Sequence, residues 1–253
     1  MKNSRKIKDY LEYVDSELIT IKKFDEIVVS AMFGVSDLAP AVISQECSAE
    51  IIFFTDNKDL KSDFATIIFL DGLCSDAREN AKWFKLFCPF LFPWAKAVWI
   101  DANVKHWLVD LDLIFKELQN NSLVLHRHPS RSNVKSEYLY LWLTGRERLN
   151  TLNRIISHRL FKENLYYGNV IGFKFSKNLT KGVLFWWYCI KTISMRDQLS
   201  LPTVANIVGD YKVISHTSSP DLWVAPHSNY IFNQGLLARF RMRIFKGAIR
   251  LIR

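Results

Sequence analysis

Glycine is scarce in this sequence of 253 residues. The nine glycines do not form the G-x-G-x-x-G or G-x-x-x-x-G-K-[ST] loops that cradle phosphates in dinucleotide-binding and P-loop proteins. The nucleophile elbow G-x-S-x-G and the zinc motif H-E-x-x-H are missing as well. If the protein handles a nucleotide, basic side chains or a metal ion must therefore hold the phosphates.

Long apolar runs and cysteine pairs are also missing. The longest apolar region, residues 84–100, is broken by lysines and prolines, so a membrane-spanning helix is not expected there. Residues 1–17 are charged and polar, where a secretory signal peptide would be apolar. The four cysteines form no C-x-x-C pair, which disfavours a zinc site or a disulfide framework. These features favour a cytoplasmic protein with reduced thiols.

Positive charge is concentrated near the end of the chain. The formal net charge is +9, but residues 239–253 hold six basic residues and no acidic one, which leaves +3 for the rest. Because the remaining chain is close to neutral, it offers no long basic groove. We therefore do not expect nucleic acid as a partner.

Residues 236–253 predict a basic amphipathic helix that follows a single domain of residues 1–235. Such a helix can lie on an anionic membrane surface, which would place the protein at the inner face of the cytoplasmic membrane. The alternative is a helix that packs on its own domain with a solvated basic face. The basic stripe consists of Arg239, Arg243, Lys246, Arg250 and Arg253, with apolar residues opposite.

Short apolar runs, often β-branched, alternate with segments of helical character. Strands that alternate with helices predict an α/β fold with a mostly parallel sheet. The expected strands are residues 27–32, 51–54, 65–70, 97–100, 122–126 and 170–175, and the expected helices are 77–87, 109–118, 135–143 and 149–161.

The segment AVWIDANV, residues 97–104, is the most informative stretch. Four apolar residues lead directly to Asp101 and Asn103, so a buried strand ends with a carboxylate and an amide oxygen. Open α/β sheets bind ligands at this edge, and hard oxygen ligands suit a divalent cation that also binds a diphosphate. The alternative is a strand that ends in an ordinary turn.

Two further segments precede this strand. Thr55 and Asp56 end an earlier strand in the same manner, either as a turn or as a ligand contact. Arg78, Lys82 and Lys85 follow at helical spacings of four and three, so they share one helix face. Such a row is either a solvated face or a set of phosphate ligands.

Two polar segments follow the AVWIDANV strand. The run HRHPSR, residues 126–131, places two histidines and two arginines at a strand end, where they could bind phosphate or sugar hydroxyls or serve as structure. Arg196-Asp197-Gln198 opens a predicted helix after Trp186-Trp187. An acidic residue in the first turn of a helix can simply interact favourably with the helix dipole. At least one of the two tryptophans is expected in the core.

Together these segments carry a family resemblance. FTD, a helix with K-x-x-K, WIDAN, HRHPSR, WW and S-x-RDQLS occur in this order. They resemble a bacterial and plant glycosyltransferase-like family that includes plant mucilage-related proteins and was formerly classed as a domain of unknown function. The resemblance spans residues 27–208 and is carried best by WIDAN, HRHPSR and RDQLS.

The resemblance implies the GT-A fold of nucleotide-diphospho-sugar transferases, with a mixed, mostly parallel sheet flanked by helices. In similar retaining transferases a D-x-D element binds Mn²⁺ or Mg²⁺ with the donor diphosphate, and here it matches Asp101-Ala102-Asn103. The neutral Asn103 lowers the charge of the site and should weaken cation binding. A late histidine often completes such a site, and both His216 and His227 are candidates.

The resemblance also implies roles for the other segments. Asp197 and Gln198 correspond to the acidic and amide pair beside the transferred sugar, and with Arg196 they are the expected catalytic residues. The residues expected to bind the donor are Ala31, Phe33, Thr55, Asp56, Arg78, Lys82, Lys85, Asp101, Asn103, His126, Arg127, His128 and Arg131.

These features predict a metal-dependent glycosyltransferase of the hexosyltransferase type. It would move a sugar from a nucleotide-diphospho-sugar, with a UDP-sugar as the expected donor, to a glycan or lipid-linked acceptor in the synthesis of cell-surface polysaccharide. The alternative is a catalytically inactive GT-A-like module that binds a glycan or a nucleotide. Asn103 and the basic tail favour that alternative.

Overall fold

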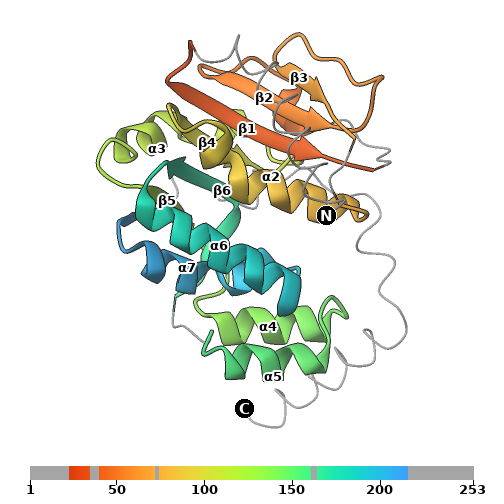
Figure 1. The fold of residues 1–253 in the computed structure, drawn as a ribbon, viewed down its shortest axis with the longest axis vertical. Coiled ribbons are helices and arrows are strands. Elements are labelled where there is room, and N and C mark those ends of the chain that lie inside the picture. The colour runs from red at the N-terminus through yellow and green to blue at the C-terminus, as the bar shows by residue number, and fades with distance from the viewer. Residues whose placement is uncertain (1–22, 35–39, 72–73, 161–163, 216–253) are drawn as a thin grey trace, which may run out of the picture.

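The computed structural model describes residues 23–34, 40–71, 74–160 and 164–215 (Figure 1). Seven strands of this part form one sheet in the order β3-β2-β1-β4-β6-β5-β7. Strand β6 runs antiparallel to both neighbours, and the other pairings are parallel. The strands are β1 (Glu26–Met32), β2 (Glu50–Thr55), β3 (Thr66–Phe69), β4 (Lys96–Ile100), β5 (Leu123–Arg127), β6 (Tyr166–Lys174) and β7 (Tyr211–Ile214).

Helices cover both faces of the sheet. One core cluster joins strand residues to α2, α6 and α7, whereas a second joins the opposite strand face to α3. A third cluster joins α4 and α5 to the end of α6, away from β1, β2 and β3 (Figure 1). The helices are α2 (Ala77–Leu91), α3 (Leu111–Glu117), α4 (Val134–Leu143), α5 (Leu149–Ser157), α6 (Lys177–Thr192) and α7 (Leu201–Val208), with short 3-10 helices at Ala41–Ile43, His106–Leu108 and Asp197–Leu199.

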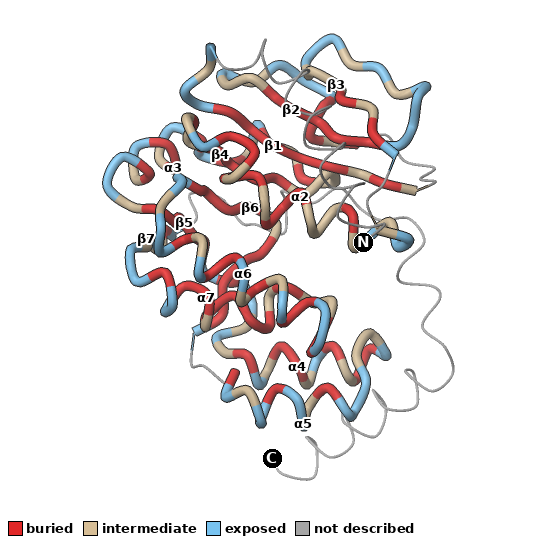
Figure 2. The backbone as a smooth tube through the Cα atoms, viewed as in Figure 1, coloured by how far each residue is buried: buried red, intermediate tan, exposed pale blue. Residues whose placement is uncertain are grey.

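The central strands are apolar along most of their length because both faces of the sheet are covered. In β1, Val28 belongs to the cluster on the α3 side, and Ile27 and Val29 belong to the cluster on the α2 side. All three are fully buried, and Figure 2 shows this burial along the strand. Parallel sheets between two helical layers have this continuous apolar pattern. The parallel pairing brings the carboxyl ends of β1 and β4 side by side.

Aromatic packing fixes helix α2 against this end of the sheet. Asp76 caps the helix and accepts two backbone N–H groups of the first turn. Phe84 stacks on Phe54 of β2 with ring centroids 4.3 Å apart, and on Phe33 after β1 at 5.4 Å. The basic row on α2 is therefore held next to the carboxyl ends of β1 and β2.

Proline within α2 alters one hydrogen bond of the helix. Pro89 has no N–H to donate to the carbonyl of Lys85. That carbonyl accepts a bond from the Cys88 thiol instead, at 3.5 Å. The backbone carbonyl of Lys85 thus has a hydrogen-bond partner within the helix, and its side chain reaches the edge of the sheet.

The expected α/β architecture, a mixed and mostly parallel sheet flanked by helices, is confirmed. All six expected strands and all four expected helices are present, although β6 begins four residues early, at Tyr166. Helix α6 and strand β7 were not expected. The successive aromatic residues of α6 obscure its helical periodicity, and β7 has only four residues. The helix expected to begin at Arg196 is a 3-10 turn followed by α7.

Residues 216–253 lie outside the part of the chain that the structure describes. The domain boundary at residue 235 and the membrane-binding helix over residues 236–253 therefore stay predictions. Among the described helices, none has the length and apolar character needed to cross a membrane.

Gly172 in β6 lets α3 approach the sheet closely. A Cβ at this position would lie 2.7 Å from Ile114 Cγ2 and 3.1 Å from Val124 Cβ. We expect Gly172→Ala to lower the free energy of unfolding by about 1–3 kcal/mol, measured by denaturant titration. The control repeats the substitution in an Ile114→Ala background, because removing the side chain that the new methyl meets should reduce the additional loss. Equal losses from Gly172→Ala in both backgrounds would contradict this packing.

Candidate functional site

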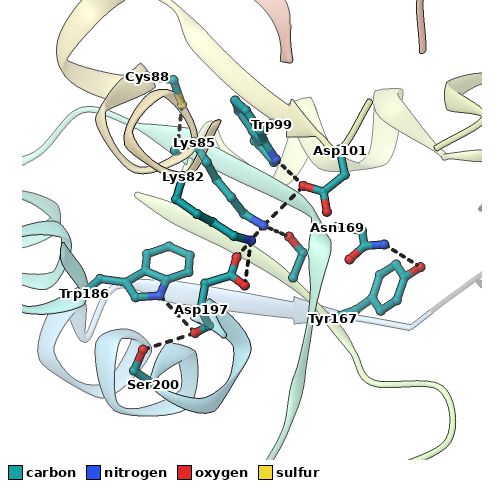
Figure 3. A network of polar contacts seen from close by, with 11 residues as sticks. Lys82, Lys85, Cys88, Trp99, Asp101, Tyr167, Asn169, Trp186, Asp197 and Ser200 are labelled. Carbon is teal, nitrogen blue, oxygen red and sulfur yellow. Dashed lines mark hydrogen bonds and ion pairs between the residues drawn. The ribbon is translucent and has the colours of Figure 1, made fainter. Parts of the chain in front are cut away.

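A cavity of about 560 Å³ opens at the carboxyl edge of β1 and β4. Ligands of open parallel sheets bind at this edge, so it is the candidate functional site. Figure 3 shows the polar network at the cavity. The lining residues are Ala31, Arg78, Ala81, Lys82, Lys85, Trp99, Asp101, Ala102, Asn103, Arg146, Asn169 and Arg196.

The ammonium group of Lys85 lies at the centre of this network, and its side chain is only 1% exposed. Its Nζ is 2.6 Å from Asp197 Oδ2 and 3.4 Å from Asp101 Oδ1, and it donates to the backbone carbonyl of Gly168. An ammonium group has three N–H donors, so these three acceptors satisfy it. Lys85 thus joins α2, the end of β4, strand β6 and the 3-10 helix Asp197–Leu199.

Asp197 is held through both its carboxylate and its main chain. Oδ1 lies 2.8 Å from Lys82 Nζ, while Oδ2 contacts Lys85. The backbone carbonyl of Asp197 accepts hydrogen bonds from the Trp186 indole at 3.0 Å and from the Ser200 hydroxyl at 3.1 Å. Trp186 is fully buried, which confirms that at least one tryptophan of the WW pair belongs to the core. Helix α6 therefore fixes the position of the carboxylate.

These three charged groups shift one another's pKa values. Burial alone would raise the pKa of Asp197, but Lys82 and Lys85 outweigh it and hold the pKa well below its usual range. Burial likewise favours a lower pKa for both lysines. For Lys82 burial prevails and the pKa is lowered, whereas Asp101 and Asp197 together raise the pKa of Lys85. Asp197 is thus ionised at neutral pH.

The end of β4 positions Asp101. Its Oδ1 accepts a hydrogen bond from the Trp99 indole at 2.7 Å, in addition to the contact with Lys85. Its backbone N–H donates to the carbonyl of Asn169 at 2.9 Å, and the Asn169 amide donates to the Tyr167 hydroxyl at 3.2 Å. These contacts fix the carboxylate at the wall of the cavity (Figure 3).

The structure brings together many of the residues expected at the site. Asp197 contacts the two lysines, and Gln198 follows it with a partly exposed side chain that does not line the cavity. The expected residues that do line the cavity are Ala31, Arg78, Lys82, Lys85, Asp101, Asn103 and Arg196.

Three residues expected to bind the donor, Phe33, Thr55 and Asp56, do not line this cavity. Phe33 stacks on α2, as described above. The Thr55 hydroxyl is buried and accepts a hydrogen bond from the N–H of Asn57 at 3.1 Å. The Asp56 carboxylate accepts from the N–H of Gly34 at 2.9 Å. Thr55 and Asp56 therefore form a turn that ties β2 to the chain after β1.

The histidine and arginine cluster lies elsewhere, which corrects the expectation that it shares the donor cavity. Arg127, His128 and Arg131 line a second cavity of about 540 Å³, and His126 is buried at the end of β5. Strand β6 separates β5 from β4, so the two strand ends are not adjacent. His128 Nδ1 accepts the backbone N–H of Arg131 at 3.0 Å, and the Arg131 side chain pairs with Glu137.

The residues expected to bind Mn²⁺ or Mg²⁺ do not form a metal site within the described ranges. There, no group of three or more His, Cys, Asp or Glu residues could hold a metal ion. Asp101 and Asn103 reach the cavity, but a cation at Asp101 would lie beside the Lys85 ammonium. His216 and His227 lie outside the described residues. The described donor set therefore does not fit a divalent ion, and metal dependence stays a prediction.

Sequence reasoning missed several residues of the site. Arg146 comes from the loop between α4 and α5, and Asn169 comes from β6. Neither lies in a motif, so no sequence signal pointed to them. Trp99 stands within WIDAN but was interpreted only as part of an apolar strand. Its proximity to Asp101, two residues later and on the same side of an extended chain, was the available signal.

Comparisons with known proteins add little to this description. No protein-family model matches the chain, and no curated protein does. Among solved structures, the chain is similar to 2-C-methyl-D-erythritol 4-phosphate cytidylyltransferase from Thermus thermophilus, with 11% sequence identity and a TM-score of 0.39. The match covers 85% of this chain and 98% of that one. At this score and identity the likeness supports no functional conclusion.

The buried ion pairs predict a large effect of neutralising Asp197. In Asp197→Asn, Lys82 and Lys85 lose their shared counter-charge, so we expect the free energy of unfolding to fall by about 3–5 kcal/mol in denaturant titrations. Glu26→Gln is the control, because its pair with Lys96 is exposed and contributes less than about 1 kcal/mol. Similar small losses in both variants would contradict the burial of the network.

The stability difference between wild type and Asp197→Asn should depend on pH. The pKa of Asp197 is lower in the folded chain than in the unfolded chain, so its stabilisation is fully present above the unfolded value of about 3.9. It is lost as the pH falls through the depressed folded value. The difference in unfolding free energy between wild type and Asp197→Asn should therefore shrink below about pH 4. A difference that grows on acidification would reverse this sign.

Proposed function

We propose that this protein is a glycosyltransferase that takes its sugar from a nucleotide-diphospho-sugar, with a UDP-sugar as the first candidate. The observation that supports the proposal is the cavity at the carboxyl edge of β1 and β4. Five basic side chains line it, against one lining carboxylate, that of Asp101. Such a cavity suits a diphosphate, because arginine and lysine are the usual ligands of phosphate oxygens.

The chemistry of sugar transfer matches this charge distribution. Cleavage of the bond between the sugar and the diphosphate builds negative charge on the leaving phosphate. Lys82 and Arg196 are placed to stabilise that charge as it forms, and the ion pair with Asp197 keeps Lys82 oriented before the reaction.

The two carboxylates have separate roles in this proposal. Asp197 is ionised but, like Gln198, does not line the cavity, and both of its carboxylate oxygens contact lysines. We therefore assign Asp197 the role of orienting Lys82 and Lys85, in place of the direct contact with the transferred sugar that the sequence resemblance implies. Asp101 holds the end of β4 and Lys85 in place. The acceptor is proposed to be a glycan or a lipid-linked saccharide, as the sequence resemblance implies.

A binding module without catalysis is the second candidate. Asn103 stands where the related pattern has a second acid, and two lysines engage the Asp197 carboxylate. A protein of this kind would bind a nucleotide-sugar or a glycan and leave it intact. Donor binding and turnover therefore have to be measured on the same preparation.

The enzyme proposal predicts release of nucleoside diphosphate. The full chain is incubated with a panel of nucleotide-sugars in Mn²⁺, Mg²⁺ or EDTA, and we expect at least one donor to be turned over. Asp101→Asn should lower that turnover by at least about a hundredfold, because it disturbs a preorganised charge network. Asp59→Asn is the control, because Asp59 is exposed and does not line the cavity.

The outcomes separate the two candidates. Donor binding without release of nucleoside diphosphate in any buffer would favour the binding module. Equal turnover by wild type and Asp101→Asn would move the active site away from this cavity. Failure to bind any nucleotide-sugar would overturn the enzyme proposal, and failure to bind glycans as well would overturn the binding module.

A further inference from the structure

The excess positive charge of the cavity matches what a diphosphate requires. Its basic lining residues are Arg78, Lys82, Lys85, Arg146 and Arg196. Against these five stand three carboxylates, so an excess of two positive charges remains. They are Asp101 in the lining, Asp197 in contact with the lysines, and Glu137, whose charge acts on Arg146 and Arg196. The two phosphate groups of a nucleotide-diphospho-sugar contribute one negative charge each. A divalent cation would add further positive charge to a site that already meets this demand.

Both carboxylates already hold lysine ammonium groups. Lys85 contacts Asp197 at 2.6 Å and Asp101 at 3.4 Å, and the Trp99 indole shares the same oxygen of Asp101 at 2.7 Å. A cation bound by Asp101 would either displace these donors from Oδ1 or lie next to a buried ammonium group. Repulsion of that kind is strong at low dielectric. The network therefore uses its acids to orient lysines.

Lys82 differs from Lys85 in what it offers to a ligand. Its side chain is 22% exposed, and within the described residues the ammonium makes one contact, with Asp197 at 2.8 Å. Two of its three N–H donors can thus reach the cavity. Arg78 lies one turn earlier on the same face of α2, and Arg196 precedes Asp197. The three side chains can surround a diphosphate from two sides.

We propose that the cavity binds the donor diphosphate without a divalent ion. Lys82, Arg78 and Arg196 contact the phosphate oxygens, and Lys85 is a positioning residue that keeps Asp101 and Asp197 engaged. The positive charge that Mn²⁺ or Mg²⁺ would supply comes from side chains already fixed in the fold. This inference rests on the proposed function, because it concerns the donor of that same site.

Calorimetric titration of the full chain with UDP tests the inference. The affinity for UDP in EDTA should lie within about threefold of the affinity in Mn²⁺. Lys82→Gln should weaken UDP binding in EDTA at least about tenfold, since it removes charge-assisted hydrogen bonds. Lys181→Gln is the matched control, because it removes the same charge from an exposed position on α6 that does not line the cavity.

Lys85→Met supplies a readout that a purely structural role would not change. The substitution keeps the length of the side chain and releases Asp101 and Asp197 from the ammonium group. We expect Mn²⁺ to strengthen UDP binding by this variant at least about tenfold, whereas Mn²⁺ leaves the wild type nearly unchanged. Thermal unfolding verifies that the variant is folded. If it is not, the Lys82→Gln comparison in EDTA still decides.

The results distinguish this inference from the proposed function. UDP binding by the wild type that requires Mn²⁺ would overturn the inference and leave the glycosyltransferase proposal intact. Metal-free UDP binding without turnover of any nucleotide-sugar would support the inference and count against the enzyme. Binding of UDP in neither buffer would overturn the inference and the assignment of a UDP-sugar as donor, and the panel of nucleotide-sugars would then decide the proposed function separately.

Discussion

The ammonium group of Lys85 lies at a point where four parts of the chain meet, and the site is built around its burial. Moving a charge from water into a protein costs several kcal/mol unless partners replace its hydration. Lys85 meets this requirement with Asp197, Asp101 and the carbonyl of Gly168. Each partner comes from a different element, so the charge is stable only when α2, the end of β4, strand β6 and the 3-10 helix Asp197–Leu199 are all in place.

This constraint explains why the surroundings are so firmly held. Stacking of Phe84 on Phe54 fixes α2, and the buried Trp186 fixes the main chain of Asp197. Because α2 and Asp197 are both fixed, Lys82 faces the cavity in a defined orientation next to Arg78 and Arg196. The site thus presents positive charge in advance of any ligand, as electrostatic stabilisation of a leaving phosphate requires. The second cavity, at Arg127 and Arg131, lies beyond β6. Glu137, which pairs with Arg131, also acts electrostatically on Arg146 and Arg196 of the first cavity.

The sequence predicted much of the fold because its strands are buried on both faces. Continuous apolar runs such as residues 97–100 leave few alternatives to a central strand, and a strand end with Asp101 marks the ligand-binding edge. Helix α6 escaped prediction because Trp186, Trp187 and Tyr188 stand in succession and hide the helical period. The HRHPSR cluster was misplaced for another reason. Chain order does not reveal that β6 inserts between β4 and β5.

The sequence by itself determined the α/β class, the strand that ends at Asp101, and the basic row Arg78, Lys82 and Lys85, because local periodicity and turn chemistry encode these features. Only the tertiary structure decided which groups the row meets. The ion pair between Lys85 and Asp197 joins residues far apart in the chain, and Arg146 reaches the cavity from the loop after α4. Such contacts depend on strand order and helix packing, which no local pattern specifies.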